Sequence, residues 1–191
     1  MEYALERIEA ADPSEVRVVT RAEKRDVVEL AERLGARVLL AEPPTLAASI
    51  LAGLAGLDQE DVALVALPDT LWEPMDGFRR MLERLDEGVD VVLGVFPSGE
   101  PERSDVVSLD ERGDVTGVAV KPPVARSHLV WGCVAARVGP LRALDAHRDP
   151  GHLFDTLARE GRVGAVCFPT QFVDIGTRES LRRSDTLNAA P

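Results

Sequence analysis

The sequence has little cysteine, which limits what can hold its fold together. Its 191 residues include two cysteines, Cys133 and Cys167, and these do not form the C-x-x-C spacing of zinc or redox motifs. A disulfide framework is therefore excluded, and both residues are expected to be buried free thiols in a reducing compartment. A chain of this length can bury roughly 70% of its unfolded surface, so it needs no cross-link or structural metal.

The sequence also lacks long apolar runs and a basic N-terminus. No segment approaches the roughly 18 consecutive apolar residues of a membrane span. The first residues, MEYALER, are acidic and helical rather than basic and then apolar, which excludes a secretory signal. We therefore expect a cytoplasmic protein.

The sequence has fewer basic than acidic residues. The chain has 22 Lys and Arg against 33 Asp and Glu, a formal net charge of −11. This balance argues against a nucleic-acid-binding surface, because phosphate backbones require clustered Lys and Arg. A small anionic substrate is still compatible with it, since such a substrate needs only one local positive site.

What is present is the composition of a soluble globular protein, with 45% apolar and 29% charged residues. The length predicts one domain over residues 1–191, and the sequence shows no internal repeat or low-complexity linker.

Helical and strand patterns alternate along the first half of the chain. Strands are predicted at 16–20, 37–40, 62–67 and 89–95, and helices at 22–34, 46–55 and 75–87. Thr45 is expected to cap the second of these helices. The strand at 62–67 is continuously apolar, as a strand buried on both faces should be. This alternation predicts an α/β fold with a mainly parallel sheet.

The second half of the chain departs from this alternation of strands and helices. Residues 105–121 alternate around a turn at 110–113, which predicts an antiparallel hairpin. Further strands are predicted at 129–137, 163–168 and 172–173, with helices at 139–147 and 152–160 and a last helix from Thr177.

Two aspartates follow predicted strands. Asp69 comes after Leu67-Pro68, and Asp174 comes after Phe172-Val173. Ligands of open α/β sheets bind beyond the carboxyl ends of the strands, so the two carboxylates could share one Mg²⁺ that also holds phosphate oxygens. The alternative is that each aspartate only organises a turn or caps the next helix.

Lys121 is unusual for its residue type. The chain has 20 arginines and only two lysines, Lys24 and Lys121, and the second ends a hairpin strand just before Pro122-Pro123. Lysine is a compact point charge that can approach a phosphate closely. The alternative is a solvated surface lysine.

Other candidates are weaker. His147 and His152 lack a third metal ligand at a suitable spacing, which favours a helix-connecting loop. Trp131-Gly132 could form a ligand platform, although an aromatic on an apolar strand more often belongs to the core. The sequence has no nucleophile elbow, Walker loop or Rossmann G-x-G-x-x-G.

Taken together, these segments resemble the sugar-phosphate nucleotidylyltransferases, most closely the glucose-1-phosphate thymidylyltransferase type. The resemblance runs from residue 1 to about residue 187 and rests on the order and spacing of EYALE at 2–6, LPDT at 67–70, VKP at 120–122, Trp131-Gly132 and FVDIGT at 172–177. It implies a three-layer, Rossmann-like nucleotide-diphospho-sugar transferase fold with an antiparallel hairpin insertion in a mainly parallel sheet.

The resemblance also implies an activity: transfer of a nucleoside monophosphate from an NTP to a sugar 1-phosphate, with release of pyrophosphate. Asp69 and Asp174 would be the magnesium ligands, and Lys121 would hold the sugar phosphate. The implied substrate contacts are Glu42, Thr45, Ala47, Asp105, Trp131 and Gly132.

The sequence departs from the family at several points. The family opens with a strand and a Gly-rich loop that cradles the triphosphate, and this sequence begins after both, so the expected fold lacks its first strand and loop. Val120 stands where the family has an acidic residue that touches the sugar. Asp105 replaces a glycine near the sugar, and Thr45 a glycine near the base.

These departures leave the activity of this chain open. The alternative is a non-catalytic regulatory or scaffolding paralogue that pairs with an intact homologue, and a homo- or hetero-oligomer is compatible with either interpretation. A metal-dependent glycosyltransferase ranks last, because no D-x-D follows the strand at 62–67.

Overall fold

The computed structural model of the chain describes residues 1–170 and 173–174. Its helices are α1 (Glu2–Glu9), α2 (Arg25–Arg33), α3 (Leu46–Gly53), α4 (Gly77–Leu85), α5 (Val138–Leu141) and α6 (Pro150–Arg159), with 3-10 turns at Pro101–Arg103 and Arg142–Ala146. Its strands are β1 (Arg17–Thr20), β2 (Arg37–Leu40), β3 (Val62–Ala66), β4 (Thr70–Leu71), β5 (Val91–Pro97), β6 (Val106–Leu109), β7 (Val115–Ala119), β8 (Leu129–Arg137), β9 (Val163–Cys167) and β10 (Val173–Asp174).

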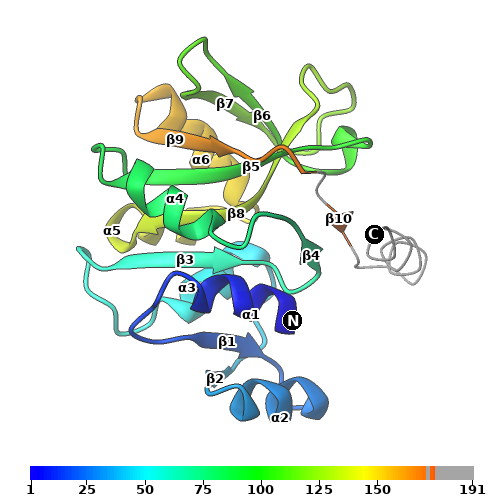
Figure 1. Cartoon of the computed structure of the whole chain (residues 1–191), viewed down its shortest axis with the longest axis vertical. Helices are drawn as coiled ribbons and strands as arrows, with labels where there is room; N and C mark the ends of the chain where they lie inside the picture. Colours follow the sequence, from blue (N-terminus) through cyan, green and yellow to red (C-terminus); the bar gives the residue numbers. More distant parts are fainter. Residues whose placement is uncertain (171–172, 175–191) are drawn as a thin grey trace.

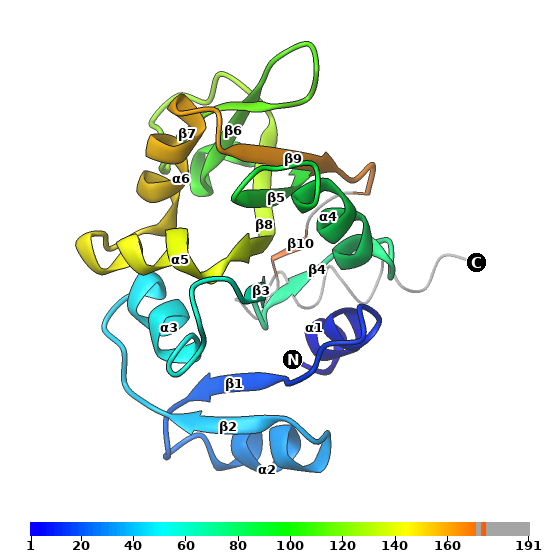
Figure 2. The same cartoon turned by 90° about the vertical axis from the view of Figure 1, so that its left-hand side faces the viewer.

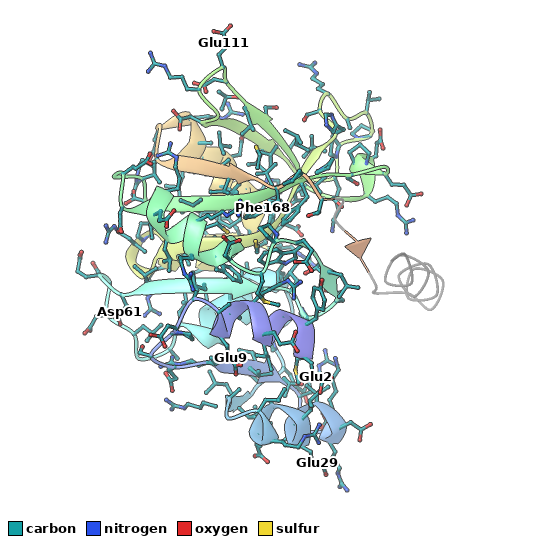
Figure 3. The ribbon with its side chains drawn as sticks, in the orientation of Figure 1. Glu2, Glu9, Glu29, Asp61, Glu111 and Phe168 are labelled. Atoms are coloured by element: carbon teal, nitrogen blue, oxygen red, sulfur yellow. The ribbon has the colours of Figure 1, made fainter. Side chains whose placement is uncertain are left out.

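Helices cover both faces of the central sheet, which confirms the expected three layers. In Figure 2, α3, α5 and α6 lie on one side of the strands and α1 and α4 on the other. One core cluster joins the sheet to α3, α5 and α6, and a second joins it to α4. Phe168, labelled near the centre of Figure 3, belongs to the second cluster and stacks on Trp72 with ring centroids 5.6 Å apart.

β8 organises the sheet. One of its edges pairs with β5, and the other pairs first with β6 and then with β3. All these pairings are antiparallel, so β3 and β5 both run opposite to β8 and point the same way. β9 is parallel to β5, and β6 and β7 form the predicted antiparallel hairpin.

The predicted elements are present, with some differences in their bounds. The cap of α3 is confirmed, since Thr45 Oγ1 accepts a hydrogen bond of 3.1 Å from the N–H of Ala48. The helix predicted at 139–147 consists instead of α5 followed by a 3-10 turn. β4, which is only two residues long, was not predicted, and the helix expected from Thr177 lies outside the described residues.

One prediction about cysteine is wrong. Cys133 is fully buried between the sheet and α4, as expected, whereas Cys167 is exposed. Cys167 is the last residue of β9, the terminal strand of its sheet, where the cover of neighbouring elements ends. Burial raises the pKa of the Cys133 thiol.

The membrane prediction can be compared with the helices directly. None of the helices formed by the described residues combines the length and the apolarity that a bilayer crossing would need.

The sheet is divided between β1 and β3. β1 and β2 pair in parallel as a separate two-stranded sheet, and within residues 1–170 and 173–174 no strand pairs with the free edge of β3. In Figure 1, β1 and β3 point the same way, one above the other. The prediction that the strand at 62–67 is buried on both faces is wrong. Val62 of β3 is 43% exposed, and Ala63 is the only buried residue of this strand.

A buried arginine attaches α1 to the segment that follows β4. Arg7 is 1% exposed, and its Nε donates a 2.7 Å hydrogen bond to the carbonyl of Trp72. Its Nη1 donates to the carbonyl of Tyr3, and its Nη2 lies 2.7 Å from Glu73 Oε1. The Tyr3 hydroxyl donates to the same Glu73 oxygen, and burial together with this bond raises the pKa of Tyr3 to about 12. No sequence pattern indicated this cluster of Arg7, Tyr3 and Glu73.

Hydrogen exchange can test the free edge of β3. The N–H of Val138 donates to the carbonyl of Asp61, so the alternation of an antiparallel pair turns the amides of Ala63 and Val65 toward β8 and those of Leu64 and Ala66 away. We expect Leu64 and Ala66 to exchange at least about tenfold faster than their neighbours. Equal protection of all four amides, measured by NMR, would show that another strand covers this edge.

Replacing Arg7 tests the attachment of α1. Arg7→Ala removes the donors of two buried carbonyls and leaves a cavity, so we expect the free energy of unfolding to fall by about 3 kcal/mol. Glu73 is half exposed and contributes little to this loss. Arg80→Ala is the control, because its ion pair with Asp76 is exposed and such pairs contribute less than about 1 kcal/mol. Similar losses for the two variants in urea unfolding would contradict a structural role of Arg7.

Candidate functional site

The candidate residues gather at the edge of the sheet where the parallel strands end. In Figure 1 the arrowheads of β1, β3 and β5 point to the same side of the molecule, and β4 and β10 also lie there. Figure 3 labels Glu2, the first residue of α1, on this side, and Asp61, which precedes β3, on the opposite side. We call this side the carboxyl edge.

The two predicted aspartates meet there through a pair of short strands. β10 pairs antiparallel with β4, and this pairing sets Asp174 opposite Thr70. Asp174 is therefore one residue out of register with Asp69, which directly precedes Thr70. The hydroxyl of Thr70 donates a 2.9 Å hydrogen bond to the carbonyl of Leu67, closing the turn that carries Asp69. Segments more than 100 residues apart in sequence are brought together in this way.

The Asp69 carboxylate has the properties of an available oxygen ligand. It is exposed, and it has no hydrogen-bond or ion-pair partner within the described part of the chain. Within the same part, no three His, Cys, Asp or Glu side chains gather as a ready-made metal cage. An exposed carboxylate such as that of Asp69 suits Mg²⁺, which usually takes one or two protein carboxylates and completes its shell with water and phosphate oxygens.

Lys121 lies at the same edge, as the pairing along β8 shows. Ala66, at the end of β3, is opposite Cys133, and Val106, at the start of β6, is opposite Val130. Three residues of β8 span about 10 Å, so the two strand ends are close together along one edge. Ala119 pairs with Val106, and Lys121 follows two residues later.

A bulge in β8 lies between these two strand ends. Gly94 of β5 is opposite Cys133 and Val95 is opposite Trp131, so Gly132 is the extra residue. Because of it, Trp131 lies in the same core cluster as Val134, although strict alternation would put it on the other face. The indole is 7% exposed and packs edge-on against Phe154 at 5.4 Å. The ring therefore belongs to the core and does not form an open platform.

The polar end of the same indole meets Asp105. Trp131 Nε1 donates a 3.2 Å hydrogen bond to Asp105 Oδ2. Gly151, in the first turn of α6, makes room for it: a Cβ there would lie 2.5 Å from Asp105 Oδ2 and 2.8 Å from a methyl of Val120. The carboxylate thus lies between β8 and the first turn of α6.

Burial dominates the electrostatics of this carboxylate. Desolvation raises the pKa of Asp105 above its usual range. The hydrogen bond from Trp131 and the charge of Lys121 oppose this rise, whereas Asp149 adds to it. The charged form of Asp105 is therefore unfavourable for the fold, and perturbation of this kind is common at functional sites.

Lys121 adopts a backbone conformation that is rare for a residue other than glycine. Its φ is +39°, in the left-handed region that non-glycine residues rarely adopt, and its side chain is exposed. Such a conformation costs about 1–3 kcal/mol and persists only where neighbouring groups impose it.

The residues expected near a nucleotide base lie on the loop after β2 and in the first turn of α3. Glu42 is exposed and Thr45 is half-buried. Ala47 is fully buried in the core, which leaves its backbone as the part that could meet a ligand.

The remaining histidine candidates do not extend the site. The rings of His147 and His152 lie 6.4 Å apart, and no third ligand joins them among the described residues. Two surface hollows, of about 630 and 530 Å³, are lined by other residues, including Arg84 with Asp114 and Glu15 with Arg37.

Comparison with known proteins identifies the family. Residues 1–162 match the family described as MobA-like NTP transferase domain. The chain belongs to this family. No curated protein matches it.

A solved structure supports the fold of this NTP transferase domain. The chain is similar to a Bacillus anthracis protein described as a glucose-1-phosphate thymidylyltransferase, solved in complex with a sucrose, with a TM-score of 0.81 and 16% sequence identity. The match covers 97% of this chain and 80% of the other. The resemblance inferred from the sequence is confirmed for family and fold, including the nucleotide-diphospho-sugar transferase architecture.

Two parts of the site were not predicted. Gly151 and Asp149, at the start of α6, meet Asp105 although they are more than 40 residues away in sequence. β4, which carries the pairing with β10, was also missed. The sequence Asp149-Pro150-Gly151 is a recognisable helix start, but nothing in it indicates a carboxylate partner.

The raised pKa of Asp105 predicts how stability depends on pH. In the folded state this carboxyl binds its proton more readily than in the unfolded state, so its contribution to stability is greatest at low pH and is lost as pH rises through the folded pKa. We expect Asp105→Asn to unfold at a higher temperature than wild type at pH 7. The difference should shrink toward pH 4, and a difference that does not change with pH in thermal scans would contradict the assignment.

Proposed function

We propose that this NTP transferase domain transfers a nucleoside monophosphate from an NTP to a sugar 1-phosphate and releases pyrophosphate. One observation carries the proposal: the pairing of β4 with β10 sets Asp174 beside Asp69 at the edge that also holds Lys121. The family supports nucleotidyl transfer in general. The similar structure described as a glucose-1-phosphate thymidylyltransferase favours a sugar 1-phosphate as the acceptor.

The proposed reaction is a displacement at the α-phosphorus of the NTP. A phosphate oxygen of the sugar 1-phosphate forms the new bond, and the bond between the α-phosphorus and the bridging oxygen to the β-phosphate breaks. Pyrophosphate leaves with that electron pair. Such a reaction depends on alignment and charge neutralisation rather than on a covalent protein intermediate.

The side chains divide these tasks. Asp69 and Asp174 would hold Mg²⁺, which when bound neutralises charge on the phosphates. Lys121, as a compact point charge, would hold the phosphate of the acceptor. Glu42, Thr45 and the backbone of Ala47 would contact the base.

A second function is favoured by the free edge of β3. An apolar strand with one open edge can pair with another chain, as the scaffolding alternative requires. That alternative predicts a stable hetero-oligomer with an intact homologue and no turnover by this chain alone.

Pyrophosphate release measured with Mg²⁺, a panel of NTPs and a panel of sugar 1-phosphates tests the proposal. Lys121→Ala is expected to lower kcat/KM for the sugar 1-phosphate about 100-fold, and Asp69→Asn to lower kcat by at least about as much. Lys24→Ala is the matched control, because Lys24 is the only other lysine and is exposed at the start of α2. Its activity should equal that of wild type.

Two outcomes would count against the proposal. Equal losses for the two lysine variants would remove Lys121 from the site. No pyrophosphate from wild type with any substrate pair would leave the scaffolding function, which co-purification with a homologue would then test.

A further inference from the structure

Thr170 makes two hydrogen bonds to one distant residue. It lies three residues after the end of β9, and its hydroxyl donates a 2.7 Å hydrogen bond to the carbonyl of Glu73. The same hydroxyl oxygen accepts a 3.3 Å hydrogen bond from the N–H of Glu73. The two residues are 97 positions apart in sequence, so one side chain joins the segment after β4 to the segment that leads to β10.

These two bonds resemble one rung of an antiparallel sheet, in which opposite residues exchange both of their backbone hydrogen bonds. A threonine hydroxyl can supply such a rung, because it is both a donor and an acceptor. Thr170 lies three residues before Val173 of β10. Pro74 lies three residues after Leu71, the partner of Val173, so the antiparallel register sets Pro74 opposite Thr170. Since proline has no N–H, a complete backbone rung is not possible there, and the hydroxyl bonds to Glu73 instead.

The pair formed by β4 and β10 is too short to fix its own register. Each strand has two residues, and so small a strand pair is marginally stable in water. A slip of one residue would turn one strand over relative to the other. Asp174 is opposite Thr70, and so beside Asp69, only in the observed alignment. A contact outside the two strands is therefore needed to hold this alignment.

The segments on both sides of the Thr170 contact are attached to the core. Phe168, labelled in Figure 3, donates its N–H to a carbonyl of β5 at 2.8 Å and stacks on Trp72. Arg7 Nε donates to the carbonyl of Trp72, and Arg7 Nη2 binds the Glu73 carboxylate. Thr170 and Glu73 therefore meet from two segments that are each held in place by other groups.

We propose that Thr170 is a positioning residue for the metal site: its hydroxyl binds both backbone groups of Glu73 and so holds β10 in register with β4. That register keeps Asp174 beside Asp69. Thr170 acts through the backbone of Glu73 and not by touching a metal ion or a substrate. The inference rests on the proposed function for the role of the two aspartates, although the register can be measured without any ligand.

The first measurement is the register of β10 on β4 in the ligand-free, ¹⁵N,¹³C-labelled full chain. Cross-strand NOEs between Leu71 and Val173 are expected in wild type, because these residues are opposite each other. Thr170→Val keeps the shape of the side chain but removes the hydroxyl and with it both hydrogen bonds. We therefore expect these NOEs to weaken at least about fivefold. Thr170→Ser keeps the hydroxyl and should retain them.

Thr116→Val is the matched control. The Thr116 hydroxyl also donates to a carbonyl across a strand pair, at 3.2 Å to Ser108, but it lies in the hairpin of β6 and β7. This variant should leave the NOEs between β4 and β10 unchanged. Thermal unfolding of each variant is recorded alongside, because lost stability alone would not alter the register below the transition. Thr170→Ala, which also lacks the hydroxyl, serves if the valine variant does not fold.

The second measurement is the binding of Mn²⁺, a spectroscopic probe for Mg²⁺, followed by electron paramagnetic resonance without nucleotide. Thr170→Val should weaken Mn²⁺ binding about tenfold, since two hydrogen bonds that hold the register are lost. Thr170→Ser should stay within about twofold of wild type, and Thr116→Val should bind as wild type does. Asp69→Asn is the reference variant, because it removes a proposed ligand directly.

The outcomes separate this inference from the proposed function. Unchanged NOEs between Leu71 and Val173 in Thr170→Val overturn the positioning role, and so does the absence of these NOEs from wild type. Mn²⁺ binding that Asp69→Asn weakens but Thr170→Val does not also overturns it, and the proposed function then stands. If wild type binds no Mn²⁺, the metal site of the proposed function is lost, while the NOEs still decide whether Thr170 sets the register.

Discussion

The arrangement of the molecule depends on the hydrogen-bonded register of β8. Its nine residues take β5 along one edge, and β6 and then β3 along the other. The interval between Val130 and Cys133 therefore fixes how far the end of β3 lies from the start of the hairpin. Because a shift of one residue would turn every side chain to the other face, this register is strongly specified by the two cores. The bulge at Gly132 is the one departure from it, and it falls at the candidate site.

Several locally unfavourable features gather at the bulge in β8. Most of β8 is packed as a core strand should be, with apolar side chains on both faces. At the bulge the packing admits a carboxylate, a left-handed lysine and a glycine that leaves space for them. Each of these is locally unfavourable, and they are tolerated because the surrounding strands and α6 over-determine their positions.

Sequence patterns indicated the candidate residues but not how they meet. Asp69 and Asp174 could be selected because each follows a predicted strand, and parallel strands end at a common edge. Lys121 could be selected because it is one of only two lysines and ends a strand of the predicted hairpin. Asp105 was selected only through the family resemblance, and Trp131 was a weak candidate from the residues alone. Gly132 within the predicted strand is a typical signal of a bulge, but nothing in the sequence indicates that the bulge brings Trp131 to Asp105. The same limit applies to Arg7, whose partners at Trp72 and Glu73 lie more than 60 residues away.

The sequence by itself determined the local structure: strand and helix alternation, the hairpin, the cap of α3 and the side of the sheet where polar residues gather. These features depend on the spacing of neighbouring residues, which periodicity reports directly. Only the tertiary structure decided that no strand among the described residues pairs with the outer edge of β3, that Trp131 is a core residue with one polar end, and that Asp174 pairs beside Asp69. Those outcomes depend on hydrogen bonds and packing between distant segments, whose formation no local pattern records.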